Sequence, residues 1–282
     1  MYTHAMKSPS PATSNAIATQ VIWMLAHREW VRFFRQPFRV VAALGQPILF
    51  WVLFGTGMHG AFRGGQAGDF MTYFLPGTTA MILLFTAIFA TISIIEDRRE
   101  GFLQSVLVAP APRWTIAFGK VLGGSAIAWV QALVFLAIAI ATGMVSLGPQ
   151  TIALLAFMFL AAIAMTSLGV CFAWPMDSTQ GFHALMNLVL MPMWLLSGSF
   201  FPIPSLAGGE PVGQVAMHWI MRANPMTYAV SGLRHLMSSV VRDEQFWIPT
   251  LTASVSVTIV FAIVASIAAS LVVRRNQTGE LQ

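Results

Sequence analysis

The sequence predicts an all-α integral membrane protein with six transmembrane helices. Hydrophobic residues make up 57% of its 282 residues and charged residues only 9%, whereas about a quarter of the residues are charged in an average soluble domain. Five intervals contain no Asp, Glu, Lys or Arg, and each is long enough to cross a hydrocarbon core of about 30 Å. These intervals are 40–58, 70–95, 121–176, 178–209 and 245–273. We therefore expect one membrane domain over residues 1–282, without a separate soluble domain.

The third interval is twice as long as one crossing requires. Gly148 and Pro149 lie near its middle and predict a tight turn between two helices. Six apolar stretches with so few charges between them are typical of a membrane bundle and not of buried helices in a soluble protein. The expected spans cover approximately residues 39–58, 72–95, 121–145, 151–174, 182–201 and 249–273.

The segment before the first span predicts an amphipathic helix over residues 15–37 that lies in the membrane interface. Four arginines recur at spacings of four, three and four, and so form one stripe on a helix. They are Arg28, Arg32, Arg35 and Arg39. Aromatic residues such as Trp30 flank this stripe, and Pro37 is expected to end or kink the helix. The alternative is a basic flank that only sets the orientation of the first span.

The distribution of Lys and Arg predicts the orientation of the chain. With both termini in the cytoplasm, eleven of the fifteen basic residues lie on the cytoplasmic side. Only Arg63, Arg222, Arg234 and Arg242 lie outside. The net charge of +5 then faces the anionic lipids of the inner leaflet. We therefore expect membrane lipids as partners and no nucleic acid.

Several function classes are disfavoured by what the sequence lacks. The predicted spans contain no Asp, Glu, Lys or Arg, although ion-coupled carriers use such groups within the bilayer. The Gly119–Lys120 pair lacks the preceding glycine and the following Ser or Thr of a phosphate-binding loop. No metal-ligand or nucleophile pattern is visible either. We therefore predict a chain that is not an enzyme and holds no metal or cofactor of its own.

The connection between the second and third spans, residues 96–120, carries unusual chemistry for this chain. Glu96–Glu100 are five consecutive charged residues, placed where the chain leaves the membrane. The apolar residues that follow have helical spacing and predict a short amphipathic helix on the cytoplasmic side, ended by Pro110. Arg113 and Lys120 are then expected to flank the entry to the third span. A short helix tied to two spans can pass a mechanical push from a soluble motor to the membrane.

With these features the sequence resembles the type-2 permease subunits of ATP-binding-cassette (ABC) exporters, which include antibiotic-resistance, nodulation-factor and polysaccharide export permeases. The resemblance covers nearly the whole chain. It rests on "EDRREGFLQSVLVAPAPRWTIAFGK" at 96–120, "LLSGSFFPIPSL" at 195–206 and "NPMTYAVSGLRHLM" at 224–237, together with the six spans and the basic N-terminal helix. The resemblance implies a multi-pass protein of the plasma (inner) membrane of a prokaryote. It also implies two permeases, as a homodimer or heterodimer, with two ABC ATPase subunits that bind ATP and Mg.

The same resemblance implies a coupling helix after the second span, seated in a cleft of the ATPase, with the N-terminal helix as a second contact. The positions that match the family's coupling motif are Glu96, Arg99, Glu100, Gly101, Pro110, Arg113, Gly119 and Lys120. The apolar residues of the coupling helix, which face the ATPase or brace the helix against the spans, are Phe102, Leu103, Val106 and Leu107. The alternative is a charged loop that only sets topology.

The outer region, residues 202–248, is too apolar for an ordinary loop, and the resemblance implies short re-entrant helices there.

Polar positions in the spans are candidates for the substrate path, namely Gln46, Thr56, Thr79, Thr86, Asn187 and Ser197. Because the spans lack charge, we expect export of an amphipathic or hydrophobic compound such as a drug, a lipid or a lipid-linked glycan. The alternatives are a membrane anchor that transports nothing and an ion-coupled carrier.

Overall fold

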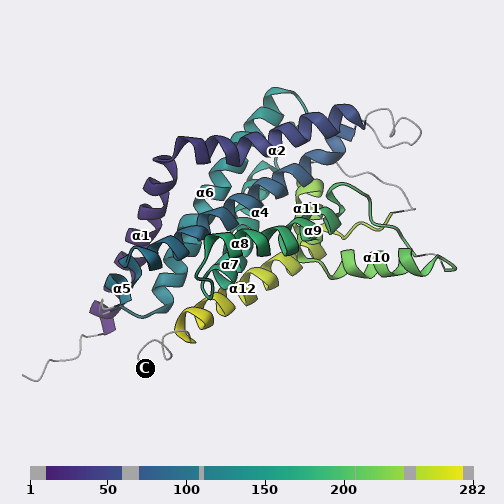
Figure 1. Ribbon diagram of the computed structural model, residues 1–282. Helices are drawn as coiled ribbons and strands as arrows, with labels where there is room; N and C mark the ends of the chain where they lie inside the picture. The colour runs from purple at the N-terminus through teal and green to yellow at the C-terminus, as the bar shows by residue number, and fades with distance from the viewer. Residues whose placement is uncertain (1–10, 59–69, 108–110, 207, 238–245, 276–282) are drawn as a thin grey trace, which may run out of the picture.

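The computed structural model describes residues 11–58, 70–107, 111–206, 208–237 and 246–275. Helices dominate this described part, and no extended strand is found in it, in agreement with the predicted all-α class (Figure 1). The elements are α1 (Pro11–Phe34), α2 (Pro37–Gly57), α4 (Phe70–Arg99), α5 (Phe102–Leu107), α6 (Trp114–Ala141), α7 (Thr151–Ala173), α8 (Thr179–Leu185), η1 (Met186–Leu190), α9 (Met191–Trp194), η2 (Leu195–Ser199), α10 (Val212–Ala223), α11 (Pro225–Leu236) and α12 (Leu251–Arg275).

Six helical segments of the described chain are long and apolar enough to cross a membrane, so the predicted number of spans is confirmed. They are α2, α4, α6, α7, the continuous run from α8 to η2, and α12. Two of them extend past their predicted ends, because α4 continues to Arg99 and α6 already begins at Trp114. The interpretation of 96–120 as one loop is therefore wrong, since only residues 100–113 lie between these helices. No proline or glycine breaks α4 near its end, so the charged residues continue the helix.

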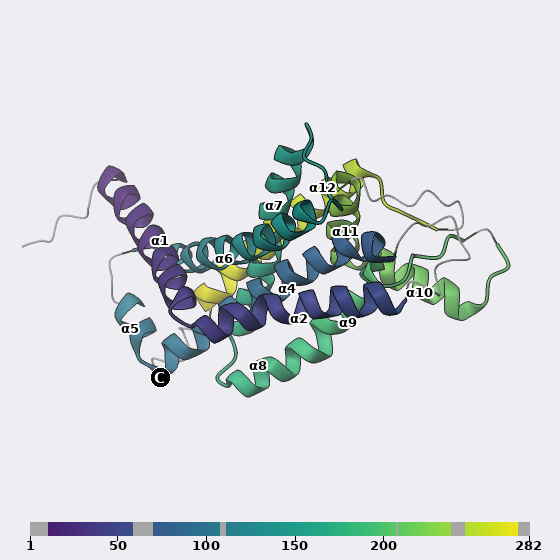
Figure 2. The same ribbon diagram turned by 90° about the horizontal axis from the view of Figure 1, so that it is seen from above.

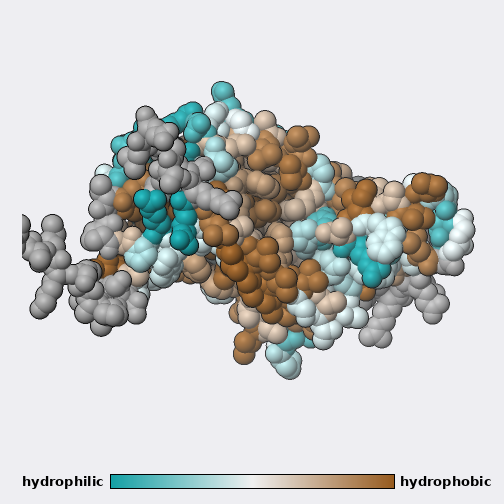
Figure 3. Space-filling view, turned by 90° about the horizontal axis from the view of Figure 1, so that it is seen from below, coloured by the Kyte–Doolittle hydropathy of each residue, from teal (hydrophilic) through white to brown (hydrophobic). Residues whose placement is uncertain are grey.

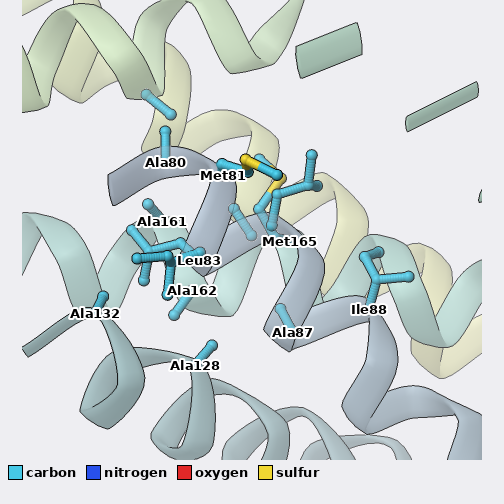
Figure 4. Packing of buried hydrophobic residues seen from close by; sticks show 14 of the residues in the cluster. Ala80, Met81, Leu83, Ala87, Ile88, Ala128, Ala132, Ala161, Ala162 and Met165 are labelled. Atoms are coloured by element: carbon cyan, nitrogen blue, oxygen red, sulfur yellow. The ribbon is translucent and has the colours of Figure 1, made fainter. Parts of the chain in front are cut away.

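Helix α4 is the centre of the bundle. Within its apolar stretch 89% of the residues are buried, compared with 17% in α2 and 22% in α12. Small side chains allow the neighbouring helices to approach α4 closely: Ala80 and Ala87 of α4, Ala128 of α6, and Ala161 and Ala162 of α7 are all buried in the same core (Figure 4). Close packing of small residues is the usual source of stability between membrane helices, where lipid is as apolar as the core.

Gly124 of α6 marks one of the closest crossings in this core. A Cβ atom there would lie 2.6 Å from Cγ2 of Thr166 on α7 and 3.3 Å from Cβ of Ala90 on α4. We predict that Gly124→Ala lowers the free energy of unfolding by about 1–3 kcal/mol, because an overpacked core must shift. The matched control is Gly45→Ala in α2, where a Cβ meets nothing within 4 Å. Thermal unfolding of both variants in detergent checks this, and equal melting temperatures would contradict it.

The two ends of the bundle differ. Helices α1 and α5 lie at one end, close to the end of α12, whereas α10 lies at the opposite end (Figures 1 and 2). We refer to these as the α5 end and the α10 end. On the face shown in Figure 3, hydrophobic side chains cover the middle, and hydrophilic ones gather toward the ends. This distribution suits a chain that crosses a membrane from one end to the other.

The fifth span is interrupted at the α10 end. Its last part, η2, is a π-helical turn in which Leu196 is non-helical and Gly198 has a φ of +79°. The side-chain amide of Asn224 donates to the carbonyl of Leu196 (3.1 Å), and Arg234 and Tyr73 both donate to the carbonyl of Gly198 (3.0 and 3.1 Å). Irregular backbone at membrane depth requires such donors for its freed carbonyls. Asn224 caps the N-terminus of α11, and Arg234 lies within α11. Helix α11 packs against α4, α7 and α12.

Candidate coupling site at the α5 end

The N-terminal helix bends where proline was expected to stop it. Helix α1 ends at Phe34 and a new helix starts at Pro37, whose fixed φ and missing N–H suit the first position of a helix. The assignment of Arg39 to the interfacial helix is therefore wrong, because Arg39 belongs to α2 and donates to the carbonyl of Phe89 on α4. Arg35 is exposed in the bend itself.

The remaining arginines of the stripe, Arg28 and Arg32, point at the end of α4. Arg28 donates to Asp97 with both terminal guanidinium nitrogens, Nη1 and Nη2, which lie 2.8 and 2.7 Å from the two carboxylate oxygens. Arg32 donates to Asp97 and to Glu96, at 2.8 Å in each case, and lies 3.4 Å from Glu100. Such forked, charge-assisted pairs combine strength with a fixed geometry. They join α1 to the end of α4.

A third cation, from α6, reaches the same carboxylate. Lys120 of α6 forms an ion pair with Asp97, and its Nζ lies 2.5 Å from Glu29 of α1 and 3.2 Å from the hydroxyl of Ser93. The side chains of Asp97, Lys120 and Glu29 are 0%, 3% and 4% exposed. The expectation that Lys120 flanks the entry to the third span is therefore wrong. It lies in the second turn of a helix that starts earlier than predicted, and it is buried between opposite charges.

We call Arg28, Glu29, Arg32, Asp97 and Lys120 the charge cluster. Burial disfavours the charged form of Arg28, but its hydrogen bonds and attraction to Asp97 outweigh this, so its pKa is raised above the ordinary value. A buried ion pair holds together only when its charges are mutually satisfied. The charge cluster therefore fixes α1, α4 and α6 relative to one another.

Helix α5 is attached to this cluster through an aromatic ring. The guanidinium carbon of Arg28 lies 3.7 Å from the ring centroid of Phe102, within the range of a cation–π contact. Leu103 and Val106 of α5 are buried in the hydrophobic core. Phe102 and Leu107 pack partly against that core. The four apolar residues predicted for this helix therefore pack toward the bundle.

The outward side of α5 carries polar residues that the sequence analysis did not single out. Gln104 and Ser105 are exposed there. Gly101, between α4 and α5, has a φ of +76°, a backbone conformation that favours glycine at the end of a helix. Pro110 lies outside the described residues. Arg113 is exposed immediately before α6.

Gly119 marks the crossing of α1 and α6. A Cβ atom at this position would lie 2.8 Å from Cβ of Leu25 in α1, so only glycine permits the observed approach. From the sequence, Gly119 and Lys120 were expected to lie in the connection between the second and third spans. They form instead a packing and charge contact between two helices.

A second connection is also tied to the end of α4. Arg98 donates to the carbonyls of Trp174 and Met176, and Arg99 donates to the carbonyl of Asp177 (3.1 Å). These carbonyls belong to the turn between α7 and α8. Movement at the end of α4 would therefore also displace the start of the fifth span.

Glu29, Asp97 and Arg98 were not predicted as site residues from the sequence. Glu29 had a visible signal, because it is an acidic residue inside a segment that was expected to face anionic lipids. Asp97 stood in the charged run but had no feature that distinguished it from its neighbours.

The six candidate path residues fall into two groups. Gln46, Thr56 and Asn187 are exposed on the outside of the chain. The others are buried, namely Thr79, Thr86 and Ser197. The hydroxyls of Thr79 and Ser197 donate to carbonyls of their own span. The single chain therefore does not bring the six residues into one cavity.

Metal ligands are not clustered in the part of the chain that the structure describes. No group of three or more His, Cys, Asp or Glu side chains there could hold a metal ion. The carboxylates of the charge cluster are occupied by arginine and lysine instead.

Comparison with known proteins identifies the family. The sequence model of the ABC-2 type transporter family matches residues 20–238. The chain is 25% identical over 238 residues to a putative transport permease, ycf38, of Cyanophora paradoxa, with 81% of this chain and 78% of that protein covered. It is 23% identical over 259 residues to the daunorubicin resistance ABC transporter permease protein DrrB1 of Streptomyces coeruleorubidus (89% and 84% covered). It is also 25% identical over 161 residues to YbhR of Escherichia coli K12, a probable multidrug ABC transporter permease (57% and 42% covered). The chain thus belongs to the ABC-2 type transporter family and is a transmembrane subunit of an ABC transporter.

Proposed function

We propose that this chain is the permease of an ABC exporter that moves an amphipathic or hydrophobic compound outward, powered by a separate ATPase. The observation that carries the proposal is the attachment of α5 to the charge cluster through Arg28 and Phe102. The names of DrrB1, a daunorubicin resistance ABC transporter permease protein, and YbhR, a probable multidrug ABC transporter permease, support a drug-like cargo. Spans without ionised groups along most of their length also suit such a cargo.

In this proposal α5 is the element that the ATPase moves. Its exposed residues Gln104 and Ser105 face away from the bundle and are available to the ATPase, while Leu103 and Val106 anchor the helix. A push on α5 passes through Phe102 to Arg28 and from there to Asp97. Because Asp97 also holds Lys120, the ends of α4 and α6 move together. A rigid link of this kind converts a small displacement into a change of helix packing.

The α5 end is then the cytoplasmic end, with both termini on that side of a prokaryotic plasma (inner) membrane. The excess of basic residues at this end supports this orientation. Two permeases and two ATPases make up the complete transporter. Polar side chains exposed on apolar spans, such as Gln46 and Asn187, would line a path between two copies.

The test is reconstitution of the chain with its partner ABC ATPase. We expect the two to purify as a complex and to export daunorubicin, used as the probe, from proteoliposomes only when ATP is supplied on the ATPase side. A complex that hydrolyses ATP without moving this or any related amphipathic drug would favour a membrane anchor. Transport without the ATPase would favour an ion-coupled carrier.

The proposed path gives a residue-level prediction. Asn187→Leu removes an exposed amide from the fifth span, and we expect drug transport to fall by up to about tenfold, the value of one or two hydrogen bonds. Thr79→Val is the control, because the Thr79 hydroxyl is buried and donates to the carbonyl of Leu75 within its own helix (3.0 Å). Assembly with the ATPase, checked by gel filtration, should be unchanged in both. Equal transport rates in the two variants would show that Asn187 does not line the path.

A further inference from the structure

A long apolar groove runs along the outside of the bundle between α6, α7 and α12. Its volume is about 530 Å³, and its walls include Phe118 of α6, Ile163 of α7, and Ile263 and Ile267 of α12. Ala262, which is buried, also lines the groove and contributes only a methyl group. Exposed isoleucines on α12 show that this face is turned away from the protein core.

The two serine hydroxyls that line the groove, of Ser266 and Ser270, are already bonded within the protein. The Ser266 hydroxyl lies 2.9 Å from that of Ser167, and the Ser270 hydroxyl donates to the carbonyl of Ser266 (2.9 Å). An occupant therefore has no hydrogen bonds to satisfy along the groove. An apolar chain fits this lining, whereas a polar compound would lose hydration without replacement.

The groove ends at the α5 end with a cation and an aromatic ring. Arg274 and Trp114 line this end, and both are exposed. Asp and Glu are absent from the described lining residues of the groove. Tryptophan and arginine at the end of an apolar span are typical of contacts with lipid headgroups.

The groove is long enough to span the hydrocarbon half-thickness of one leaflet. Helix α12 lines the groove from Ile259 to Arg274, which is roughly 22 Å of helix at 1.5 Å per residue. Half of a hydrocarbon core is about 15 Å thick. One acyl chain can therefore extend from the level of Arg274 to the middle of the bilayer within the groove.

We infer that this groove binds one anionic phospholipid of the leaflet at the α5 end, with an acyl chain along α12 and the phosphate at Arg274. The positive charge of Arg274 favours an anionic headgroup, because a nearby basic residue attracts anionic lipid. A second copy of the chain fits the face less well. Two-fold pairing through this groove would bring two copies of the same cation to the same depth in the membrane.

The test uses the full-length chain in lipid nanodiscs that contain phosphatidylglycerol with a photoreactive group on its acyl chain. We expect cross-links to peptides of α6 and α12. Arg274→Gln should reduce this labelling by about fivefold, the effect of one basic residue at a membrane surface. Ile263→Trp should strongly reduce it, because the larger side chain obstructs the groove from its α12 wall. The controls are Val264→Trp, on α12 but outside the groove lining and 58% exposed, and Arg35→Gln, exposed at the same end.

Both controls should be labelled like the unaltered chain. Phosphatidylcholine with the same photoreactive chain should be labelled less, because it lacks the net negative charge. The inference is overturned by equal labelling from the two lipids, by equal labelling of Ile263→Trp and Val264→Trp, or by the absence of label on α6 and α12, which is the result expected if a second copy covers this face.

Discussion

Asp97→Asn is expected to lower the free energy of unfolding by about 3–5 kcal/mol, the cost of leaving buried charges without their counterion. Asp97 is fully buried and accepts hydrogen bonds from Arg28, Arg32 and Lys120. An asparagine keeps the shape of the side chain but removes the negative charge. Lys120 would then keep Glu29 alone as its buried acidic partner. Thermal unfolding in detergent, followed by circular dichroism, measures the loss.

Glu100→Gln is the matched control, since it removes a carboxylate of the same run of sequence. Glu100 is 60% exposed and lies 3.4 Å from Arg32, so its removal should change the free energy of unfolding by less than about 1 kcal/mol. If Asp97→Asn is as stable as Glu100→Gln, the charge cluster does not hold the helices together.

Arg28→Gln is expected to separate ATP hydrolysis from transport in the reconstituted complex. Arg28 contacts the ring of Phe102 on one side and the carboxylate of Asp97 on the other. A glutamine cannot make the forked pair or the cation–π contact, whose loss together is worth about 1.5–3 kcal/mol. We therefore expect transport per ATP hydrolysed to fall by about tenfold or more. The measurement is drug transport and phosphate release in the same proteoliposomes.

Two further variants keep this prediction testable if Arg28→Gln lowers stability. Phe102→Leu retains an apolar side chain at α5 but removes the ring. It should also lower transport per ATP hydrolysed, but by less than Arg28→Gln. Arg35→Gln removes a cation from the exposed bend after α1 and should leave the ratio unchanged. A proportional fall of both rates in Phe102→Leu would show that α5 serves assembly and not coupling.

The six spans could be predicted because apolar length is a local property of the sequence. The charge cluster could not, because its partners are brought together by the fold. Lys120 and Glu29 are 91 residues apart, and Lys120 and Asp97 are 23 apart. In sequence each looks like a residue hydrated at the membrane surface. Only the pairing explains why their charges can be buried.

The sequence also does not show which face of each span contacts protein and which contacts lipid. Most spans are apolar all round, so no periodic pattern shows which side meets protein and which meets lipid. For this reason Thr79 and Asn187 looked alike as path candidates, although one is buried and the other exposed. The bend at Pro37 was visible in the sequence, but its effect on the arginine stripe depended on where α2 begins.

The central claim is that α5 and the ends of α4 and α6 move as one body. The most direct measurement is the distance between spin labels on Ser105 of α5 and Phe118 of α6, both exposed, by pulsed electron paramagnetic resonance. Cys171, the single cysteine of the chain, is first replaced by alanine. We predict one narrow distance distribution that is the same with and without ATP trapped in the ATPase, and that broadens in Arg28→Gln. A distance that changes when ATP is trapped in the unaltered chain, or a distribution that Arg28→Gln leaves narrow, would contradict the account.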